Sequence, residues 1–237
     1  MRKLVLLASF LVILILAIVP VSAQGGSSAF VRIAHFAINV DDVDVYIDGN
    51  LRSIGRDLGY GTATSWLVVP AGDFEFAVTP AGRSMNAAII ESTVVSLEAG
   101  SRTTIVALGD TQTTGITAHV ITEDYDDLPE FQARVTVLHA DPALGAVDLW
   151  SDGELFQGRM AYPGSLTLLS GGTNDGVTSF DMVEGRYDFT VVPNGQSGPV
   201  MIDMSDTDLT AQTFYFVVLT RDEDGNPSAV VIEQTAN

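Results

Sequence analysis

Two stretches of the chain each place a histidine nine residues ahead of an aspartate. His35 precedes Asp44, and His139 precedes Asp148. An imidazole near a carboxylate could act as a general base or as a metal ligand. A metal site usually needs three or four ligands, and neither histidine belongs to a known ligand motif. We therefore expect both to be structural, with the ring bound to loop backbone and the aspartate accepting from its other nitrogen.

A second group of oxygen ligands lies in "DEDGN", where Asp222, Asp224 and Asn226 alternate. This spacing resembles the start of a calcium-binding loop, so we expect no cofactor but keep Ca²⁺ as a possibility. An EF-hand loop needs glycine at its sixth position, but Pro227 occupies that place. A hairpin turn explains the segment better.

Nucleophilic catalysis has little support in the sequence. The chain has no cysteine and no Gly-x-Ser-x-Gly motif. Thirty acidic residues make close carboxylate pairs unavoidable, so spacing alone identifies no glycosidase pair. We predict that the protein is not an enzyme, and a secreted hydrolase is only the second alternative.

Two aromatic residues suggest a different chemistry. Tyr46 and Trp150 occupy equivalent places, and each shares a strand face with an aspartate, Asp48 or Asp152. If the valine and isoleucine face is the core, these rings point outward, where they could stack on a sugar while the carboxylates bind its hydroxyls. Alternatively, a neighbouring strand covers the rings, since large aromatic side chains are usually well buried.

These side chains must be positioned by strands. Residues 42–48 alternate strictly between apolar and polar, which is typical of a half-buried strand. Short β-branched and aromatic segments recur between Asp-Gly, Ala-Gly, Glu-Gly and Asn-Gly turns. Even residues 84–100, the best helix candidate, contain Ile, Thr and Val that favour strand. The sequence predicts an all-β protein of antiparallel, immunoglobulin-like sandwiches.

An internal repeat organises the chain. "HFAINVDDVDVYIDG" at 35–49 recurs as "HADPALGAVDLWSDG" at 139–153, an offset of 104. We predict two tandem sandwiches, residues 30–122 and 132–235, joined by an acidic linker at 123–131. The second copy carries an insertion near residues 168–179, which we read as a loop that is either a binding element or a tolerated insertion.

The alternation also predicts the two cores. The first core is expected to contain Val43, Val45, Ile47, Phe74, Phe76, Val78, Ile105 and Ala107. The second is expected to contain Val147, Leu149, Tyr187, Phe189, Val191 and Val217.

The N-terminus predicts export. Arg2 and Lys3 precede an apolar run at 4–19, Pro20 ends the run, and Val-Ser-Ala ends at Ala23. This is the layout of a secretory signal peptide over residues 1–23, and the run is shorter than the roughly 20 residues of a membrane span. We therefore expect a secreted or envelope protein with no membrane insertion after cleavage.

Charge restricts the partners. The chain has 11 basic and 30 acidic residues, and loss of the signal peptide would leave 9 against 30, a net charge of −21. Such a surface repels nucleic acid and anionic lipid headgroups, and it keeps an exported protein soluble.

The residues of the repeat resemble a known bacterial family, the secreted domain of unknown function DUF4397. The resemblance rests on His139–Pro142, Val147–Trp150, Val43–Gly49, Val69–Gly72 and Val78–Gly82. The first copy lacks the usual proline in "HFAINVDD", and the second departs at "MVEG". The resemblance implies an exported β-sandwich, often in tandem, and it implies no activity or catalytic residue.

These observations favour an exported, non-catalytic module that binds or builds at the cell surface. Its partner could be a glycan, a protein or an envelope component. The first alternative is an adhesion or assembly protein whose acidic loops hold Ca²⁺. Fold class alone does not choose between them.

Overall fold

The computed structural model describes residues 28–165 and 174–235, and within them the chain is nearly all β-strand. The expected signal peptide (1–23) lies outside the described residues, as does the start of the expected loop at 168–179. The helical segments described are two single turns, η1 (Ser53–Gly55) and η2 (Met85–Ala87). The all-β prediction is confirmed.

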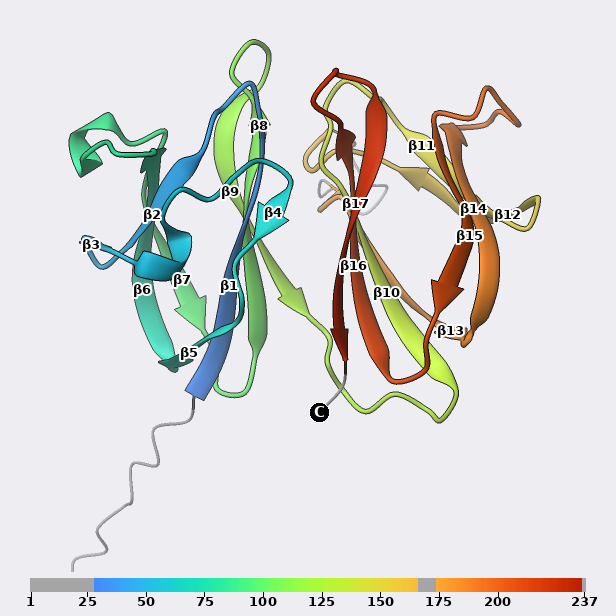
Figure 1. Ribbon diagram of the computed structural model, residues 1–237, viewed down its shortest axis with the longest axis horizontal. Helices are drawn as coiled ribbons and strands as arrows, with labels where there is room; N and C mark the ends of the chain where they lie inside the picture. The colour runs from blue at the N-terminus through green and yellow to red at the C-terminus, as the bar shows by residue number, and fades with distance from the viewer. Residues whose placement is uncertain (1–27, 166–173, 236–237) are drawn as a thin grey trace, which may run out of the picture.

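Strands up to residue 123, here called the first half, form two facing sheets (Figure 1). One sheet has the order β4-β1-β8-β9, with β5 also paired to β1, and the other has the order β3-β2-β6-β7. The strands are β1 (Ser28–Ile38), β2 (Val43–Ile47), β3 (Asn50–Leu51), β4 (Thr62–Ala63), β5 (Leu67–Pro70), β6 (Gly72–Pro80), β7 (Ile90–Leu97), β8 (Arg102–Asp110) and β9 (Gly115–Glu123).

Strands from residue 132 onward, the second half, form two further sheets with a matching order. These are β13-β10-β16-β17 and β12-β11-β14-β15. The strands are β10 (Gln132–His139), β11 (Val147–Ser151), β12 (Glu154–Met160), β13 (Val177–Val183), β14 (Gly185–Pro193), β15 (Ile202–Leu209), β16 (Thr213–Arg221) and β17 (Pro227–Thr235). The expected loop therefore ends before residue 179, because Val177, Thr178 and Ser179 pair with β10.

Two strand pairs differ from the purely antiparallel expectation. β1 pairs with β8 in parallel, and β10 pairs with β16 in parallel. Parallel neighbours need a long crossover connection, and here the connecting chain includes all strands of the opposite sheet of each half. Two of the four sheets are therefore mixed.

Each half encloses its own hydrophobic core, and the predicted core residues belong to these two clusters. Of the residues predicted for the cores, Phe74 in the first half and Tyr187 in the second are partly buried, and the others are fully buried. The period-2 pattern thus identified the inward face of both halves.

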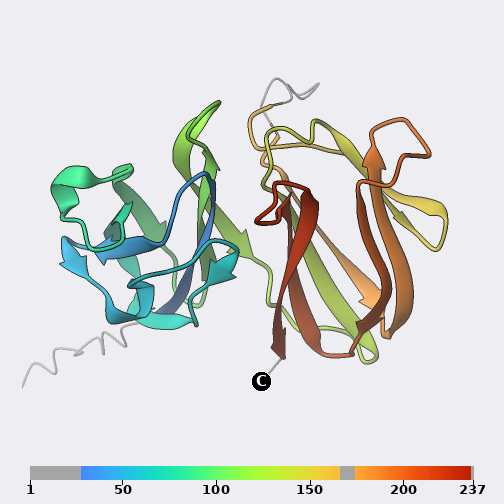
Figure 2. The same ribbon diagram turned by 45° about the horizontal axis from the view of Figure 1, so that its top comes forward.

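A third hydrophobic cluster joins the two halves. It contains Ala34, Phe36, Val106, Leu108, Ile121, Leu138, Ala140, Phe216 and Val218. The strands β1, β8, β10 and β16 consequently bury both faces, and nearly every one of their residues is buried. Figures 1 and 2 show the result as four sheets stacked in layers, with the two mixed sheets innermost.

A buried ion pair accompanies this interface. The Arg32 guanidinium donates to the Glu123 carboxylate at 2.7 Å, and both side chains are almost fully buried. Thr104 connects them, because its hydroxyl accepts from Arg32 Nε at 2.7 Å and donates to Glu123. The guanidinium also lies over the rings of Trp66 and Phe216, at 4.6 and 5.1 Å from their centroids.

The segment between the halves is packed against both. Glu123, expected in the linker, is the last residue of β9. Tyr125 stacks on Phe214 of the second half, with ring centroids 4.1 Å apart, and meets Trp66 of the first half edge-on at 5.8 Å. Leu128 is buried. The segment therefore contributes apolar contacts to the join.

Candidate functional site

His35 is fully buried in β1, and backbone groups bind both of its ring nitrogens. The Ala37 N–H donates to Nδ1 at 3.3 Å, so the proton of the neutral ring is on Nε2, which donates to the Asp41 carbonyl at 3.0 Å. Burial lowers the pKa of His35. A neutral ring that links a strand to the next loop has no nitrogen free for a metal or a substrate.

His139 occupies the same place in β10 and is also fully buried. Its Nε2 donates to the Gly145 carbonyl at 2.7 Å, whereas Nδ1 has no hydrogen-bond partner among the described residues. Burial lowers the pKa of His139 as well. Neither ring bonds to the aspartate nine positions later, since those carboxylates have other partners.

The Asp44 carboxylate is buried and accepts from two loops. The backbone N–H of Asp57 donates to Oδ1 at 3.0 Å, and that of Gly82 donates to Oδ2 at 2.9 Å. The carboxylate therefore ties strand β2 to the chain segments on either side of it.

Asp148 does the same in the second half, with one more donor. Its carboxylate accepts from the backbone of Arg159 at 2.7 Å, from the backbone of Gly195 at 2.8 Å and from the Asn194 amide at 2.6 Å. Burial acts to raise the pKa of Asp148, but these hydrogen bonds outweigh it and the pKa is lowered.

Asp48 and Asp152 are turn residues. Both have a positive φ, 50° and 51°, and each is followed by a glycine with positive φ, as a two-residue type I′ hairpin requires. Their carboxylates accept from the backbone N–H of Glu75 and Asp188, each at 3.0 Å. These contacts give both aspartates a role in the turns that requires no ligand.

Tyr46 and Trp150 are half-buried. The Tyr46 hydroxyl donates to the Arg83 carbonyl at 3.0 Å. The indole nitrogen of Trp150 is buried and has no hydrogen-bond partner among the described residues. Only part of each ring is open to a sugar, and sugar stacking at these positions stays a prediction.

The acidic turn at Asp222 closes the hairpin between β16 and β17. One carboxylate oxygen of Asp222 accepts from the backbone N–H of Asp224 at 3.0 Å and of Asn226 at 2.8 Å. The Asn226 amide lies 3.2 Å from the other oxygen. Across residues 28–165 and 174–235, no group of three or more His, Cys, Asp or Glu side chains could hold a metal ion. Calcium binding at this turn stays a prediction.

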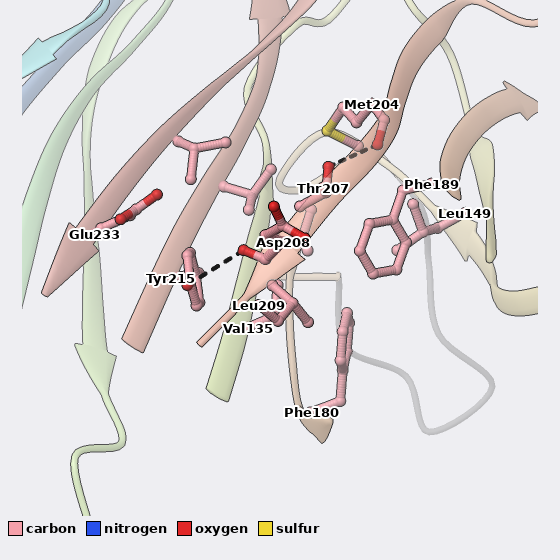
Figure 3. A pocket seen from close by; sticks show the side chains of 13 residues that line it. Val135, Leu149, Phe180, Phe189, Met204, Thr207, Asp208, Leu209, Tyr215 and Glu233 are labelled. Atoms are coloured by element: carbon pink, nitrogen blue, oxygen red, sulfur yellow. Dashed lines mark hydrogen bonds between the residues drawn. The ribbon is translucent and has the colours of Figure 1, made fainter. Parts of the chain in front are cut away.

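A cavity in the second half, which we call the second-half cavity, was not predicted. It has a volume of about 320 Å³ and lies between the two sheets (Figure 3). Its lining is mostly apolar and comes from both sheets: Val135, Val137, Leu149, Phe180, Phe189, Met204, Thr207, Asp208, Leu209, Tyr215, Val217, Val231 and Glu233. Most of these positions have the pattern of ordinary core residues, and that pattern does not indicate a space between them.

The few polar groups of the wall are already bonded. The Tyr215 hydroxyl accepts from the Thr210 N–H at 3.0 Å, and it points toward the Asp208 carbonyl at 3.5 Å. The Thr207 hydroxyl donates to the Met204 carbonyl at 2.6 Å. A ligand in the interior would therefore make mainly apolar contacts.

The mouth of the second-half cavity is acidic. Its lining includes the exposed side chains of Asp208 in β15 and Glu233 in β17. Arg186 binds both oxygens of Asp208, at 3.0 and 3.2 Å, and lowers the pKa of that carboxyl. Val231, also on β17, is 45% exposed beside an apolar space. An acidic, partly apolar rim thus surrounds an apolar interior.

One family model matches the chain. It is described as Domain of unknown function (DUF4397), and it covers residues 29–150 as a single domain. The match includes the first half and the start of the second half. It therefore shows one domain and not a tandem pair. No protein with a curated description matches the chain.

Several solved structures resemble the chain weakly. The CBM26 module CBMbc of Eubacterium rectale Amy13K, solved with maltoheptaose, is 14% identical with a TM-score of 0.28, over 88% of this chain and 97% of that one. A streptococcal virulence factor described by its alpha-glucan binding is 15% identical with a TM-score of 0.23, over 80% and 92%. The tip fimbrial protein Mfa3 of Porphyromonas gingivalis is 11% identical with a TM-score of 0.25, over 87% and 98%. Scores this low support no argument about this chain.

Proposed function

The chain belongs to the DUF4397 family, a domain of unknown function, and from this starting point we propose that it is an exported, non-catalytic binding module of the cell surface or extracellular space. We propose further that the second-half cavity is its binding site. The observation that carries the proposal is a mostly apolar space of about 320 Å³, to whose lining the edge strands β15 and β17 contribute exposed side chains. Ligand sites in proteins are usually concave, apolar and of at least about 300 Å³.

The non-catalytic part of the proposal is supported by the state of the acid–base candidates. His35 and His139 are fully buried, and Asp44 and Asp148 are buried beneath loops whose N–H groups they bind. A general acid or base must reach the proton that it transfers. These four side chains hold the fold together and cannot reach a substrate.

Export is supported by the sequence. The expected signal peptide at 1–23 precedes a strongly acidic chain without cysteine. The described residues contain no helix that is long and apolar enough to cross a membrane. N-terminal sequencing of the secreted protein should find Gln24 as its first residue.

We also propose that the two halves are copies of one domain, residues 30–122 and 132–235. Their strands pair in a matching order, and each half has one parallel pair at its centre. A glycan, a protein or an envelope component could present the apolar group that enters the cavity. The hairpin at Asp222 carries no part of this proposal.

The proposal is tested with a neutral apolar fluorophore. N-phenyl-1-naphthylamine, titrated into the purified exported protein, should give a saturable rise in fluorescence at one site. Thr207→Phe should weaken this binding at least about tenfold, because the added ring occupies the cavity. Overpacking costs about 1–3 kcal/mol, so thermal melting must show that the variant folds.

Ser205→Phe is the matched control. Ser205 lies on the same strand but is exposed and does not line the cavity. It should bind the fluorophore as the unchanged protein does. Equal binding by all three proteins, or no binding at all, would rule out the second-half cavity as the site.

A further inference from the structure

The geometry points to a ligand class for the second-half cavity. We propose that it takes the apolar chain or ring of a neutral or cationic amphiphile and discriminates against an anionic headgroup. This inference rests on the proposed function and adds the charge and size of the ligand.

The volume of the cavity limits the size of the apolar group that it can hold. About 320 Å³ holds on the order of ten carbon groups if each takes about the 30 Å³ of a water molecule in the liquid. Such a volume lies at the small end of known ligand pockets. A linear chain of about ten carbons or a two-ring aromatic group fits this size, whereas a long acyl chain would protrude.

The wall excludes an anionic group from the interior. The hydroxyls of Tyr215 and Thr207 are already bonded to neighbouring backbone groups. Among the described residues, no cationic side chain lines the cavity. A buried carboxylate, sulfate or phosphate would lack the donors that repay its loss of water. The charged or polar head of the ligand must therefore stay at the mouth.

The mouth then selects the charge of the head. Arg186 binds the carboxylate of Asp208, but among the described residues no cationic side chain pairs with Glu233. Glu233 is exposed on β17, one of the two edge strands beside the opening, and Figure 3 shows it at the border of the cavity. An ammonium at this place gains a partner, and an anion is repelled.

The Glu233 carboxylate is particular to the second half. Tyr215 pairs with Val135 and Glu233 across its sheet. At the matching register of the first half, Thr103 pairs with Val31 and Thr122. Thr122 thus stands where the second half has the Glu233 carboxylate.

The test compares three ten-carbon amphiphiles that differ only in the head: decyltrimethylammonium, decyl glucoside and decyl sulfate. Each is titrated into the purified exported protein below its micelle-forming concentration, with displacement of N-phenyl-1-naphthylamine as the signal. We expect decyltrimethylammonium and decyl glucoside to displace the fluorophore, and decyl sulfate to bind at least about threefold more weakly than the glucoside.

Glu233→Gln separates the headgroup effect from binding of the chain. This substitution should weaken the binding of decyltrimethylammonium by roughly threefold to tenfold, since one charge pair near water is worth about 1 kcal/mol. Decyl glucoside should bind as before. Glu223→Gln, at an exposed turn position outside the lining, is the matched control and should change neither affinity.

The outcomes distinguish the two proposals. If the fluorophore binds at the cavity but decyl sulfate binds as well as the other amphiphiles, the charge inference is wrong and the proposed function stands. If decyltrimethylammonium binds equally to the unchanged and Glu233→Gln proteins, the role of Glu233 is wrong. If the fluorophore binds no differently in Thr207→Phe, the proposed site itself fails.

Discussion

The ring of Tyr125 stacks on the ring of Phe214 with 4.1 Å between centroids, and this contact fixes the segment between the halves onto the second half. Tyr125 also meets Trp66 of the first half. Together with the third hydrophobic cluster, it makes the two sandwiches pack as one body. Burial raises the pKa of Tyr125 to about 12, so the ring stays neutral at this interface.

Replacement of Tyr125 tests this join. Tyr125→Ala should lower the free energy of unfolding by about 2 kcal/mol, because an aromatic pair and its buried area are lost. Urea unfolding measures the change. Phe131→Ala, in the same segment but 60% exposed, is the control and should change it by less than about 1 kcal/mol. Equal effects of both variants would contradict a specific role for the Tyr125 stack.

The buried ion pair gives a second prediction. Glu123→Ala leaves the Arg32 guanidinium buried without its carboxylate, and this should cost about 3–5 kcal/mol in urea unfolding. The double variant Arg32→Met with Glu123→Leu should recover part of that loss, since no charge then remains buried. A double variant as unstable as the sum of the single variants Arg32→Met and Glu123→Leu would mean that the two side chains contribute independently and not as a pair.

Stability should also depend on pH through the histidines. Burial lowers the pKa of His35 and of His139 in the folded protein, so the unfolded chain binds protons first as pH falls. The stability that the two neutral rings contribute is complete above about pH 6.5, the pKa of histidine in the unfolded chain. It is lost as the pH falls toward the lower pKa values that the rings have in the folded protein. The carboxyls of Asp110 and Asp148 also have lowered pKa values, but they change the free energy of unfolding only below about pH 4.

We therefore expect the free energy of unfolding to fall by about 1–3 kcal/mol between pH 7 and pH 5.5. In His139→Gln the same fall should be smaller, because one proton-binding group is gone. Urea unfolding at a series of pH values measures both slopes. A flat profile over this window would show that the rings bind protons as readily in the folded state as in the unfolded chain, and would contradict the lowered pKa values.

The turn at Asp222 gives a prediction about calcium. Since its carboxylate already accepts from two backbone N–H groups, Ca²⁺ at millimolar concentration should leave the melting temperature as it is in EDTA. Asp222→Ala should lower stability by about 1 kcal/mol in EDTA as well, through loss of these bonds. A rise of about 10 °C with Ca²⁺ would instead support the calcium-dependent alternative.

The period-2 pattern predicted the inward residues, and the Asp-Gly pairs predicted the hairpins, because both depend on local backbone geometry. Asp48 and Asp152 show this directly, as each adopts the positive φ of a type I′ turn. The repeat also predicted that His35 and His139 would have equivalent places, although the aspartate was wrongly expected to bind them.

Features that depend on contacts between distant segments could not be predicted from the sequence. The continuous burial of β1 and β16 comes from packing between the halves, and a half-buried sandwich sheet would have shown alternation instead. The second-half cavity depends on how side chains from seven strands fill the space between two sheets. Glu233, on the last strand, was the one available signal, since its first-half counterpart Thr122 is uncharged.

The central claim is that an apolar group enters the second-half cavity, and methyl NMR of the exported protein with ¹³C-labelled methionine tests it most directly. Met204 lines the cavity, whereas Met85 lies in η2 of the first half. On titration with decyl glucoside, we predict a saturable shift of the Met204 methyl signal and none for Met85. A Met204 signal that stays in place while decyl glucoside binds would contradict the claim.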